Sequence, residues 1–324
     1  MNTVQDVLSY LYDHEDTYVS GQLIASNLSI SRSAIWKAIE TLRDEGYCID
    51  AVTNKGYRLV PTSELLDKTQ LESLLSPHPL HFFGVIDSTN RYAKQLAGEG
   101  AVHGTAVISA FQSEGRGRLG RTFASPKGGM YISVILRPRC KTEDALLVTS
   151  AAAVAVSRAV KKVCNLELGI KWVNDLFYKN KKVCGILTEG VIDVESGTLS
   201  SLVVGIGVNF STPSTAFDPQ LQMIVTSLYD GFSQVPDGVD PNVLAAEIVH
   251  GVLALSDILP DNSFLEEYRR SSIILGKKIL VINQKQKRLA KGVEIDNQAH
   301  LTVEYQDSSR ETLGTGEISI RLDV

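Results

Sequence analysis

The strongest constraint on this chain is a stretch with the sequence GRGRLGRTFASP at positions 115–126. Three arginines are interspersed with three glycines, and an aromatic residue, Phe123, follows them. Glycine allows positive φ angles and a close approach of the backbone to a ligand. The planar guanidinium of arginine matches phosphate and carboxylate groups. The stretch therefore predicts a loop that grips an anion, and the alternative is a solvated basic loop between two strands.

The segments on either side of this loop favour the first interpretation. Residues 102–111 before it and residues 130–137 after it have the apolar character of buried strands. A loop that a core holds at both ends can present its side chains in a fixed arrangement, as functional loops do.

The composition limits the class of protein. A length of 324 residues suggests two or three domains, and a net charge of −5 does not indicate a wholly basic nucleic-acid binder. The N-terminus lacks the features of a signal peptide, and no apolar run is long enough to span a membrane. The four cysteines and six histidines show neither a disulfide framework nor metal-ligand spacing. We therefore expect a cytoplasmic protein with no firm metal site, in which Cys184 is a small core residue.

Residues 1–62 have the pattern of a winged helix-turn-helix. Apolar residues recur at helical spacing in residues 4–11, and a second helical segment begins at Ser20. Ser31 can cap a third helix over about residues 32–45, and two short alternating segments that follow it predict a hairpin.

The charge of this region is unevenly distributed. Residues 1–60 contain five Lys and Arg against eight Asp and Glu, a net charge of −3. All five basic residues lie in the third helix or the hairpin, which enter or flank a DNA groove in this motif. The predicted DNA-binding residues are Arg32, Ser33, Lys37 and Lys55. The alternative is a helical interaction domain with a solvated basic face, and a net-acidic DNA-binding domain would need dimerisation to bind tightly.

Two further motifs follow the arginine loop: KWVND at positions 171–175 and KVCGIL at positions 182–187. With GRGRLGR and the N-terminal region, they resemble the family of bifunctional biotin protein ligases and biotin-operon repressors. The resemblance covers nearly the whole chain in the same order and implies a multidomain α+β protein. It implies a winged helix-turn-helix domain at residues 1–62, a class II synthetase-like catalytic domain with a mixed sheet at residues 65–268, and a small SH3-like β-barrel at residues 270–324.

The resemblance also implies which residues form the site. The catalytic residues would be Lys182, Arg116 and Arg118. The biotin-binding residues would be Ser88, Thr89, Asn90, Gln112, Gly115, Arg116, Arg118, Lys182, Gly185, Ile186 and Leu187. The residues that bind ATP or the adenylate would be Arg118, Arg121, Phe123, Asn174, Asp175 and Asn209. From the residues alone, the segment 88–90 could simply cap a helix, and the Asn-Asp pair at 174–175 could simply form a turn.

One position departs from the family pattern. The family often has tryptophan where Phe123 stands. Phenylalanine keeps the stacking face and lacks the N–H donor, so a contact with adenine would be made by stacking alone. Arg321, in the last predicted strand, is a further candidate for a nucleotide or acceptor contact.

The activity that the resemblance implies has two steps. Biotin and ATP would form biotinyl-5′-AMP and pyrophosphate with Mg²⁺, and a lysine of a biotin carboxyl carrier protein, a subunit of acetyl-CoA carboxylase, would then accept the biotin. A homodimer with bound biotinyl-AMP would bind operator DNA and repress biotin genes. Two alternatives stay open: a ligand-sensing transcription factor without ligase activity, and a lipoate-type ligase on a related fold.

Overall fold

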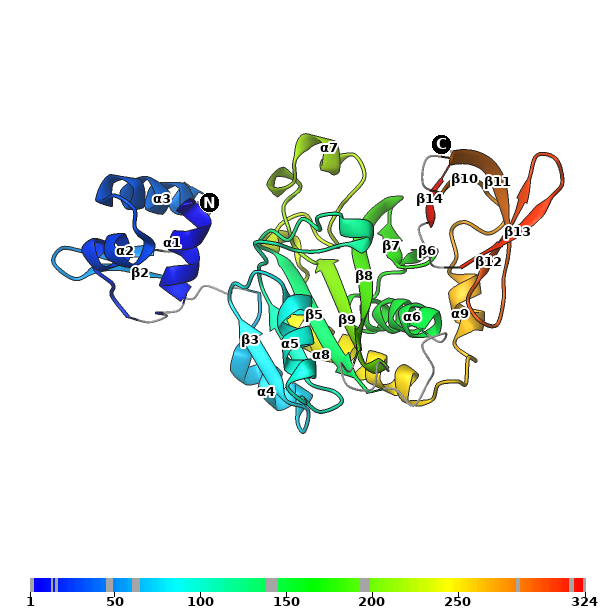
Figure 1. Cartoon of the computed structure of the whole chain (residues 1–324), viewed down its shortest axis with the longest axis horizontal. Coiled ribbons are helices and arrows are strands. Elements are labelled where there is room, and N and C mark those ends of the chain that lie inside the picture. Colours follow the sequence, from blue (N-terminus) through cyan, green and yellow to red (C-terminus); the bar gives the residue numbers. More distant parts are fainter. Residues whose placement is uncertain are drawn as a thin grey trace.

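The structure is a computed structural model that describes residues 3–12, 14, 17–44, 49–59, 65–137, 145–192, 199–283, 286–314 and 318–322. Three folded units follow one another along the chain: an N-terminal helical unit, a central unit around a seven-stranded sheet, and a C-terminal five-stranded sheet (Figure 1). The junction between the domains expected at residues 1–62 and 65–268 lies outside the described residues.

The N-terminal unit contains a helix-turn-helix followed by a hairpin. Its elements are α1 (Thr3–Tyr12), α2 (Gly21–Leu28), α3 (Arg32–Asp44), β1 (Ile49–Val52) and β2 (Gly56–Leu59). Ser20 Oγ accepts a hydrogen bond from the Leu23 N–H at 3.1 Å, and Ser31 Oγ accepts one from the Ala34 N–H at 3.1 Å. Both serines therefore cap helices, as the sequence predicts for Ser31. The apolar faces of the three helices meet in one buried cluster that includes Val7, Leu11, Ile24, Ile35, Ile39 and Leu42.

The central unit is built on a mixed sheet with the strand order β3-β4-β5-β9-β8-β7-β6. The strands are β3 (Leu80–Phe83), β4 (Ala106–Ser109), β5 (Gly129–Leu136), β6 (Gly169–Lys171), β7 (Asp175–Tyr178), β8 (Lys181–Ile192) and β9 (Leu199–Asn209). β3 and β4 are parallel, and the other neighbouring pairs are antiparallel. β4 is shorter than the strand predicted at residues 102–111, because the chain turns at residues 102–105, where Thr105 N–H donates to the Val102 carbonyl at 3.2 Å and Gly104 has a φ of 85°.

Helices cover both faces of this sheet. The helices of the central unit are α4 (Lys68–Leu75), α5 (Thr89–Gly98), α6 (Ala145–Cys164), α7 (Pro219–Gln222), α8 (Pro241–Asp257) and α9 (Leu265–Arg270). Of these, α5 packs on one face of the sheet, and α6 and α8 pack on the other. Alternate side chains of β5 point to opposite faces: Ile132 and Val134 join the cluster that contains α6 and α8, whereas Ile135 joins a smaller cluster with Ala93 and Ala97 of α5. The alanine-rich helix α6 packs in the core of this unit.

The C-terminal unit is an antiparallel sheet with the strand order β13-β12-β11-β10-β14. Its strands are β10 (Lys278–Asn283), β11 (Gln286–Ile295), β12 (Leu301–Tyr305), β13 (Arg310–Leu313) and β14 (Ile318–Leu322). The region in which the resemblance implies a small β-barrel thus forms five strands. Trp172 Nε1–H donates to the Ala299 carbonyl at 2.9 Å, which joins this sheet to the central unit. In the part of the chain that the structure describes, no helix combines the length and apolar character needed to cross a membrane.

Candidate active site

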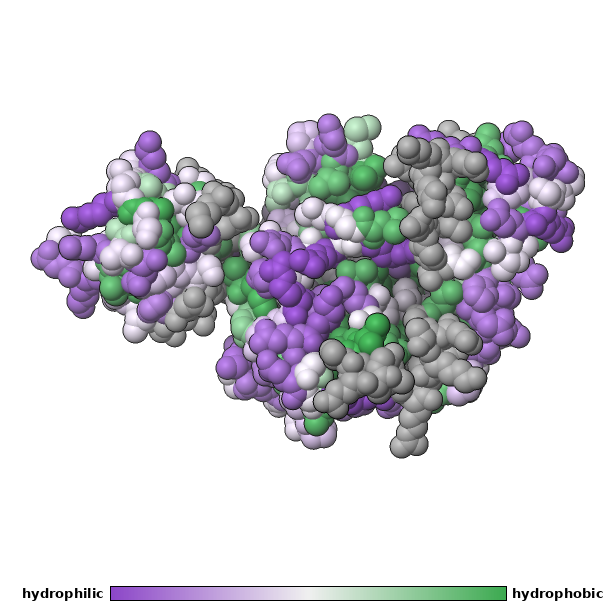
Figure 2. Space-filling view, viewed as in Figure 1, coloured by the Kyte–Doolittle hydropathy of each residue, from purple (hydrophilic) through white to green (hydrophobic). Residues whose placement is uncertain are grey.

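A pocket of about 980 Å³, counting the part that is open to solvent, lies on the face of the central sheet that α5 covers only in part. Its wall comes from the N-terminus of α5, the arginine loop, the β6–β7 turn and the central part of strands β5, β8 and β9. The face of the molecule seen in Figure 2 carries a band of hydrophilic side chains across the central unit, with small apolar patches between them. Sequence segments up to 119 residues apart, from Ser88 to Gly207, thus meet in one cavity.

The arginine loop (residues 115–123) closes one side of the pocket. Phe123 N–H donates to the Gly115 carbonyl at 2.9 Å, and Gly117 N–H donates to the Arg121 carbonyl at 2.8 Å. A Cβ atom at Gly115 would lie 2.3 Å from Ser125 Oγ, so this position has no room for a side chain. The loop is therefore a small closed structure anchored on the core, and it is not a free surface loop.

Glycines in the strands make room for the loop on the sheet. A Cβ at Gly207 would lie 2.4 Å from the Phe123 ring, and a Cβ at Gly185 would lie 2.8 Å from it. A Cβ at Gly205 would lie 2.1 Å from Asn90 Oδ1. The floor of the pocket is therefore flat because these three strand positions lack side chains.

One end of the pocket is lined by neutral polar groups at the start of α5. Ser88 Oγ accepts from the Arg91 N–H at 3.5 Å, and the N–H and the hydroxyl of Thr89 donate to Gln112 Oε1 at 2.8 and 3.0 Å. Gln112 Nε2 donates to Ser125 Oγ at 2.9 Å. Ser88 is thus a helix cap, and it also lines the pocket. This end of the pocket, with Ser88, Thr89, Asn90, Gln112 and Ser133, is called the neutral end below.

Ser133 of β5 holds the neutral end together, and sequence reasoning missed it. Its fully buried hydroxyl lies 2.6 Å from Asn90 Oδ1 and 2.8 Å from Thr89 Oγ1. Tyr131, two residues earlier on the same strand, lines the pocket and was missed as well. The only sequence signal for Ser133 is a small polar residue inside an otherwise apolar strand, on the face opposite Ile132 and Val134.

The opposite end of the pocket is charged. Lys182 Nζ lies 2.6 Å from Asp175 Oδ1 and 5.5 Å from the centroid of the Phe123 ring. Arg118 Nη1 donates to Asn174 Oδ1 at 3.1 Å, and Asn174 Nδ2 donates to the Ile186 carbonyl at 2.8 Å. Burial lowers the pKa of Arg118, against the opposing attraction of Asp175, yet an arginine keeps its charge. This end, with Arg118, Arg121, Asn174, Asp175 and Lys182, is called the cationic end below.

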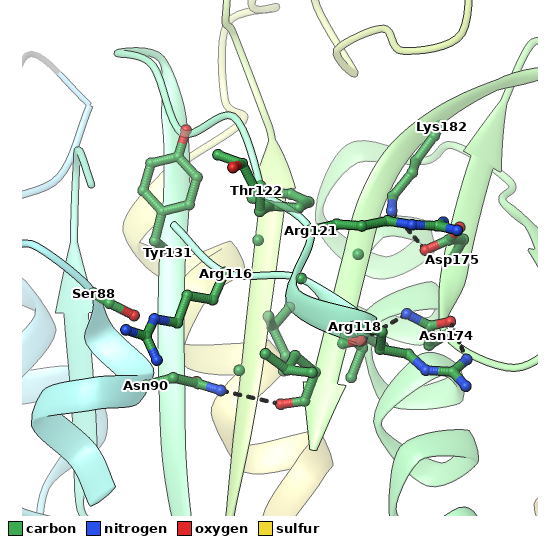
Figure 3. Close-up of a pocket in the computed structure, with 18 of the residues that line it drawn as sticks. Ser88, Asn90, Arg116, Arg118, Arg121, Thr122, Tyr131, Asn174, Asp175 and Lys182 are labelled. Atoms are coloured by element: carbon green, nitrogen blue, oxygen red, sulfur yellow. Dashed lines mark hydrogen bonds and ion pairs between the residues drawn. The ribbon is translucent and has the colours of Figure 1, made fainter. Parts of the chain in front are cut away.

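The three arginines of the loop do not point in one direction. Figure 3 shows Arg118 directed toward Asn174 and Arg121 toward Asp175 and Lys182, whereas Arg116 is directed toward Ser88 and Asn90. Among the described residues that line the pocket, Asp175 alone carries a carboxylate, against Arg116, Arg118, Arg121, Lys171 and Lys182. The pocket therefore suits a ligand with a neutral polar part at one end and anionic groups at the other.

Most of the predicted site residues line this one pocket. They are Ser88, Thr89, Asn90, Gln112, Arg116, Arg118, Arg121, Phe123, Asn174, Asp175, Lys182, Gly185, Ile186 and Leu187. Gly115 lies at the base of the loop. Asn209 does not line the pocket; its Nδ2 donates to the Thr226 carbonyl at 3.1 Å. The side chain of Arg321 lies outside what the structure describes.

Among the described residues, no cysteine or histidine lines the pocket. Cys184 is buried as predicted, and burial raises the pKa of its thiol, which makes it a poor nucleophile. Cys48 and Cys140 lie outside the described residues. In the described ranges of the chain, no three His, Cys, Asp or Glu side chains are grouped as metal ligands.

The predicted DNA-binding residues lie on the N-terminal unit. Arg32, Ser33 and Lys37 are exposed on α3, and Lys55 is exposed in the turn between β1 and β2. Lys55 Nζ lies 5.7 Å from the centroid of the Tyr18 ring. The same face of α3 carries Trp36, which is 57% exposed and which sequence reasoning did not single out.

Comparison with known proteins agrees with this architecture. Residues 82–209 match the model of the Biotin/lipoate A/B protein ligase family, and residues 3–58 match that of an HTH domain. The bifunctional ligase/repressor BirA of Bacillus spizizenii is 36% identical over 230 residues, which cover 69% of this chain and 70% of the relative. The protein of the same name from Salmonella typhimurium is 29% identical over 97% of this chain and 96% of its own length.

A solved structure shares the fold of the larger part of the chain. The biotin protein ligase from Aquifex aeolicus in complex with biotin and ATP superposes with a TM-score of 0.63 at 23% identity, and the match covers 76% of this chain and 99% of that one. Sequence and fold agree, and the chain belongs to the family of bifunctional ligase/repressor BirA proteins.

Proposed function

We propose that this chain activates biotin with ATP to biotinyl-5′-AMP, transfers the biotin to a lysine of a biotin carboxyl carrier protein, and represses biotin genes when the adenylate is bound. The observation that carries the proposal is the pocket with two unlike ends: hydroxyl and amide groups at one, and Lys182 with Arg118 and Arg121 at the other. A relative matched over 97% of this chain is named bifunctional ligase/repressor, and a structural relative was solved with biotin and ATP.

In this proposal the two ends divide the work. Ser88, Thr89, Gln112 and the backbone at Gly115 bind the ureido end of biotin, and Gly185, Ile186 and Leu187 line its rings. The carboxylate then lies near Lys182 and attacks the α-phosphorus of ATP, with pyrophosphate as the leaving group. Lys182 and Arg118 hold the two reacting anions together and stabilise the charge that develops at phosphorus. Asp175 orients Lys182 through their 2.6 Å ion pair.

The remaining residues shield and position the nucleotide. Phe123 stacks on the adenine or covers the site, Arg121 holds phosphate or the loop, and Asn174 binds nucleotide. The arginine loop keeps water from the mixed anhydride until the acceptor lysine attacks its carbonyl carbon and expels AMP. Asn209 and Arg321 stay candidates for nucleotide contacts.

A magnesium ion fits this site if oxygen atoms of the protein and of the substrate phosphates bind it together. Asp175 carries the carboxylate nearest to the proposed phosphate position, and Mg²⁺ is commonly held by one or two carboxylates together with substrate phosphates. Asp175 and Asn174 would hold such an ion, which would offset phosphate charge.

The second activity concerns the N-terminal unit. We place operator binding on Arg32, Ser33, Lys37 and Lys55, and we expect a homodimer, since two half-sites are needed to compensate for the acidic net charge of this unit. We also propose that the chain has three domains: a winged helix-turn-helix domain at residues 1–62, a class II synthetase-like domain at residues 65–268, and an SH3-like barrel at residues 270–324.

The test of the chemistry separates biotin from its rival substrate. The purified chain is incubated with α-labelled ATP and either biotin or lipoate, and the labelled acyl-adenylate is resolved by chromatography. We expect biotinyl-AMP and no lipoyl-AMP. Lipoyl-AMP alone would support the lipoate-type ligase, and no adenylate with either acid, together with biotin-dependent DNA binding, would support the sensor without ligase activity.

A further inference from the structure

Glu189 of β8 stands behind the neutral end of the pocket without lining it. Its Oε2 accepts a hydrogen bond from Asn90 Nδ2 at 2.9 Å, and its Oε1 lies 2.7 Å from Lys94 Nζ. The side chain is 25% exposed, and both partners belong to α5. A carboxylate on the sheet therefore holds the helix whose N-terminus carries Ser88, Thr89 and Asn90.

Both the oxygen and the nitrogen of the Asn90 side-chain amide form hydrogen bonds within the protein. Its Oδ1 accepts from Ser133 Oγ at 2.6 Å, and its Nδ2 donates to Glu189 and to the Leu187 carbonyl, the latter at 3.3 Å. Gly205 packs against the Asn90 amide, since a Cβ at Gly205 would lie 2.1 Å from Asn90 Oδ1. Asn90 thus has one orientation, and Glu189 supplies one of the contacts that fix it.

The charge of Arg116, in the arginine loop, also acts on Glu189 through electrostatic attraction. Burial alone would raise the pKa of this carboxyl, but the hydrogen bonds from Lys94 and Asn90 and the attraction of Lys94 and Arg116 lower it. The carboxylate is therefore ionised at neutral pH. Arg116 is the loop arginine whose side chain is directed toward Ser88 and Asn90, away from the other two arginines (Figure 3).

We propose that Glu189 is a positioning residue for biotin: its charge fixes the Asn90 amide and holds Arg116 over the neutral end, so that the loop closes on the ureido side while Arg118 and Lys182 are left for the anions. This inference rests on the proposed function and adds a residue to it. Because the effect acts through charge at one end of the pocket, loss of that charge should weaken biotin binding and leave ATP binding nearly intact.

The test compares Glu189→Gln with a matched control. Glutamine keeps the shape and an acceptor for Asn90 and removes the charge. The control is Glu167→Gln, which breaks an exposed ion pair, 3.0 Å from Lys161, between residues that do not line the pocket. For each protein we would measure biotin affinity by calorimetry, KM for biotin and for ATP in pyrophosphate exchange, thermal stability, and the rate of trypsin cleavage after Arg116 by mass spectrometry.

We expect Glu189→Gln to weaken biotin binding about tenfold, to change the KM for ATP less than about twofold, and to speed cleavage after Arg116, since a charge-assisted contact is replaced by a neutral one. Arg116→Gln should have a similar effect on biotin, and the two losses should be less than additive in the double variant, because the charges of Glu189 and Arg116 attract each other.

Two results would overturn the inference. Unchanged biotin affinity and cleavage in Glu189→Gln would show that the charge positions nothing, and equal losses for biotin and ATP with lower thermal stability would show a merely structural role. Failure of the wild-type chain to bind biotin would overturn the proposed function itself, and it would be seen before any variant is made.

Discussion

The two ends of the pocket are built by different physical means. At the neutral end the polar groups bind one another: Thr89, Gln112, Ser133 and Asn90 form a continuous hydrogen-bonded set on α5, β5 and the start of the loop. At the cationic end the side chains are held by ion pairing and burial, with Lys182 on Asp175 and Arg118 on Asn174.

The difference shows which end is prepared for which ligand. A closed hydrogen-bond network fixes geometry, and it suits recognition of a neutral group through precise donors and acceptors. A cluster of cations with one carboxylate has excess positive charge, which an anionic ligand neutralises. A substitution at one end should therefore weaken the binding or reaction of one substrate more than that of the other.

The largest effect among the loop arginines is expected for Arg118→Ala. Removing a buried cation that faces the developing charge should slow adenylate formation about a hundredfold, with a smaller change in biotin affinity measured without ATP. Single-turnover formation of biotinyl-AMP gives the rate. Arg158→Ala is the control, because Arg158 forms a surface pair with Glu267 at 2.8 Å, remote from the pocket. An equal effect of both substitutions would contradict the assignment.

A smaller effect, with the opposite preference, is expected for Ser133→Ala. The change leaves a buried acceptor of Asn90 or Thr89 without its donor, and such a loss costs about 1–3 kcal/mol. Biotin affinity should fall about tenfold, since a cost of about 1.4 kcal/mol is a factor of ten, while the KM for ATP stays constant. Ser201→Ala, at a fully buried serine of neighbouring β9, is the matched control. If the KM for ATP rose as much as that for biotin, the two ends would not be separate.

The smallest effect on either end is expected for Asp240→Ala, which alters the scaffold alone. Asp240 caps α8 through the Asn242 N–H at 2.8 Å and accepts from Gln70 Nε2 at 2.5 Å. Loss of such a cap costs about 1 kcal/mol of stability, and both substrates should be bound as before. Urea unfolding with biotin and ATP titrations checks both statements.

The effect of Asp240→Ala should also depend on pH in a defined direction. Burial raises the pKa of Asp240, but the hydrogen bonds from Gln70, Asn242 and Val243 outweigh it and leave the pKa below the ordinary 3.8. A carboxyl whose pKa is lowered on folding stabilises the protein above its unfolded pKa, and this stabilisation is lost as the pH falls through the folded pKa. The difference in stability between wild type and variant should thus be constant above about pH 5 and shrink below pH 3.8. A difference that grew on acidification would contradict the capping role.

The sequence predicts the parts of the molecule whose signals are local. The arginine loop follows from its glycines and arginines, Ser31 from its place before α3, and α1 from its helical periodicity. Ser133 could not be predicted, because its role depends on the alignment of β5 under α5, which no local pattern encodes. The same applies to Glu189, whose partners Asn90 and Lys94 lie 99 and 95 positions away in the chain.

The sequence also could not predict the directions in which the side chains of the loop point. Arg116 and Arg118 are two positions apart, and a pattern-based account gives them one shared role. In the structure they point to opposite ends of the pocket, because the hairpin-like closure of the loop between Gly117 and Arg121 turns the chain between them (Figure 3). The spacing of charged residues in a loop thus indicates the chemistry and leaves the arrangement open.

The central claim, that Lys182 at the cationic end joins biotin and ATP, is tested most directly by biotin-dependent exchange of pyrophosphate into ATP. The measurement compares the wild type with Lys182→Ala and with Lys179→Ala, a neighbouring lysine that stacks on Tyr178 at 5.0 Å outside the pocket. We predict exchange in the wild type and in Lys179→Ala, and a loss of at least about a hundredfold in Lys182→Ala. Full exchange in Lys182→Ala, or no biotin-dependent exchange in the wild type, would contradict the account.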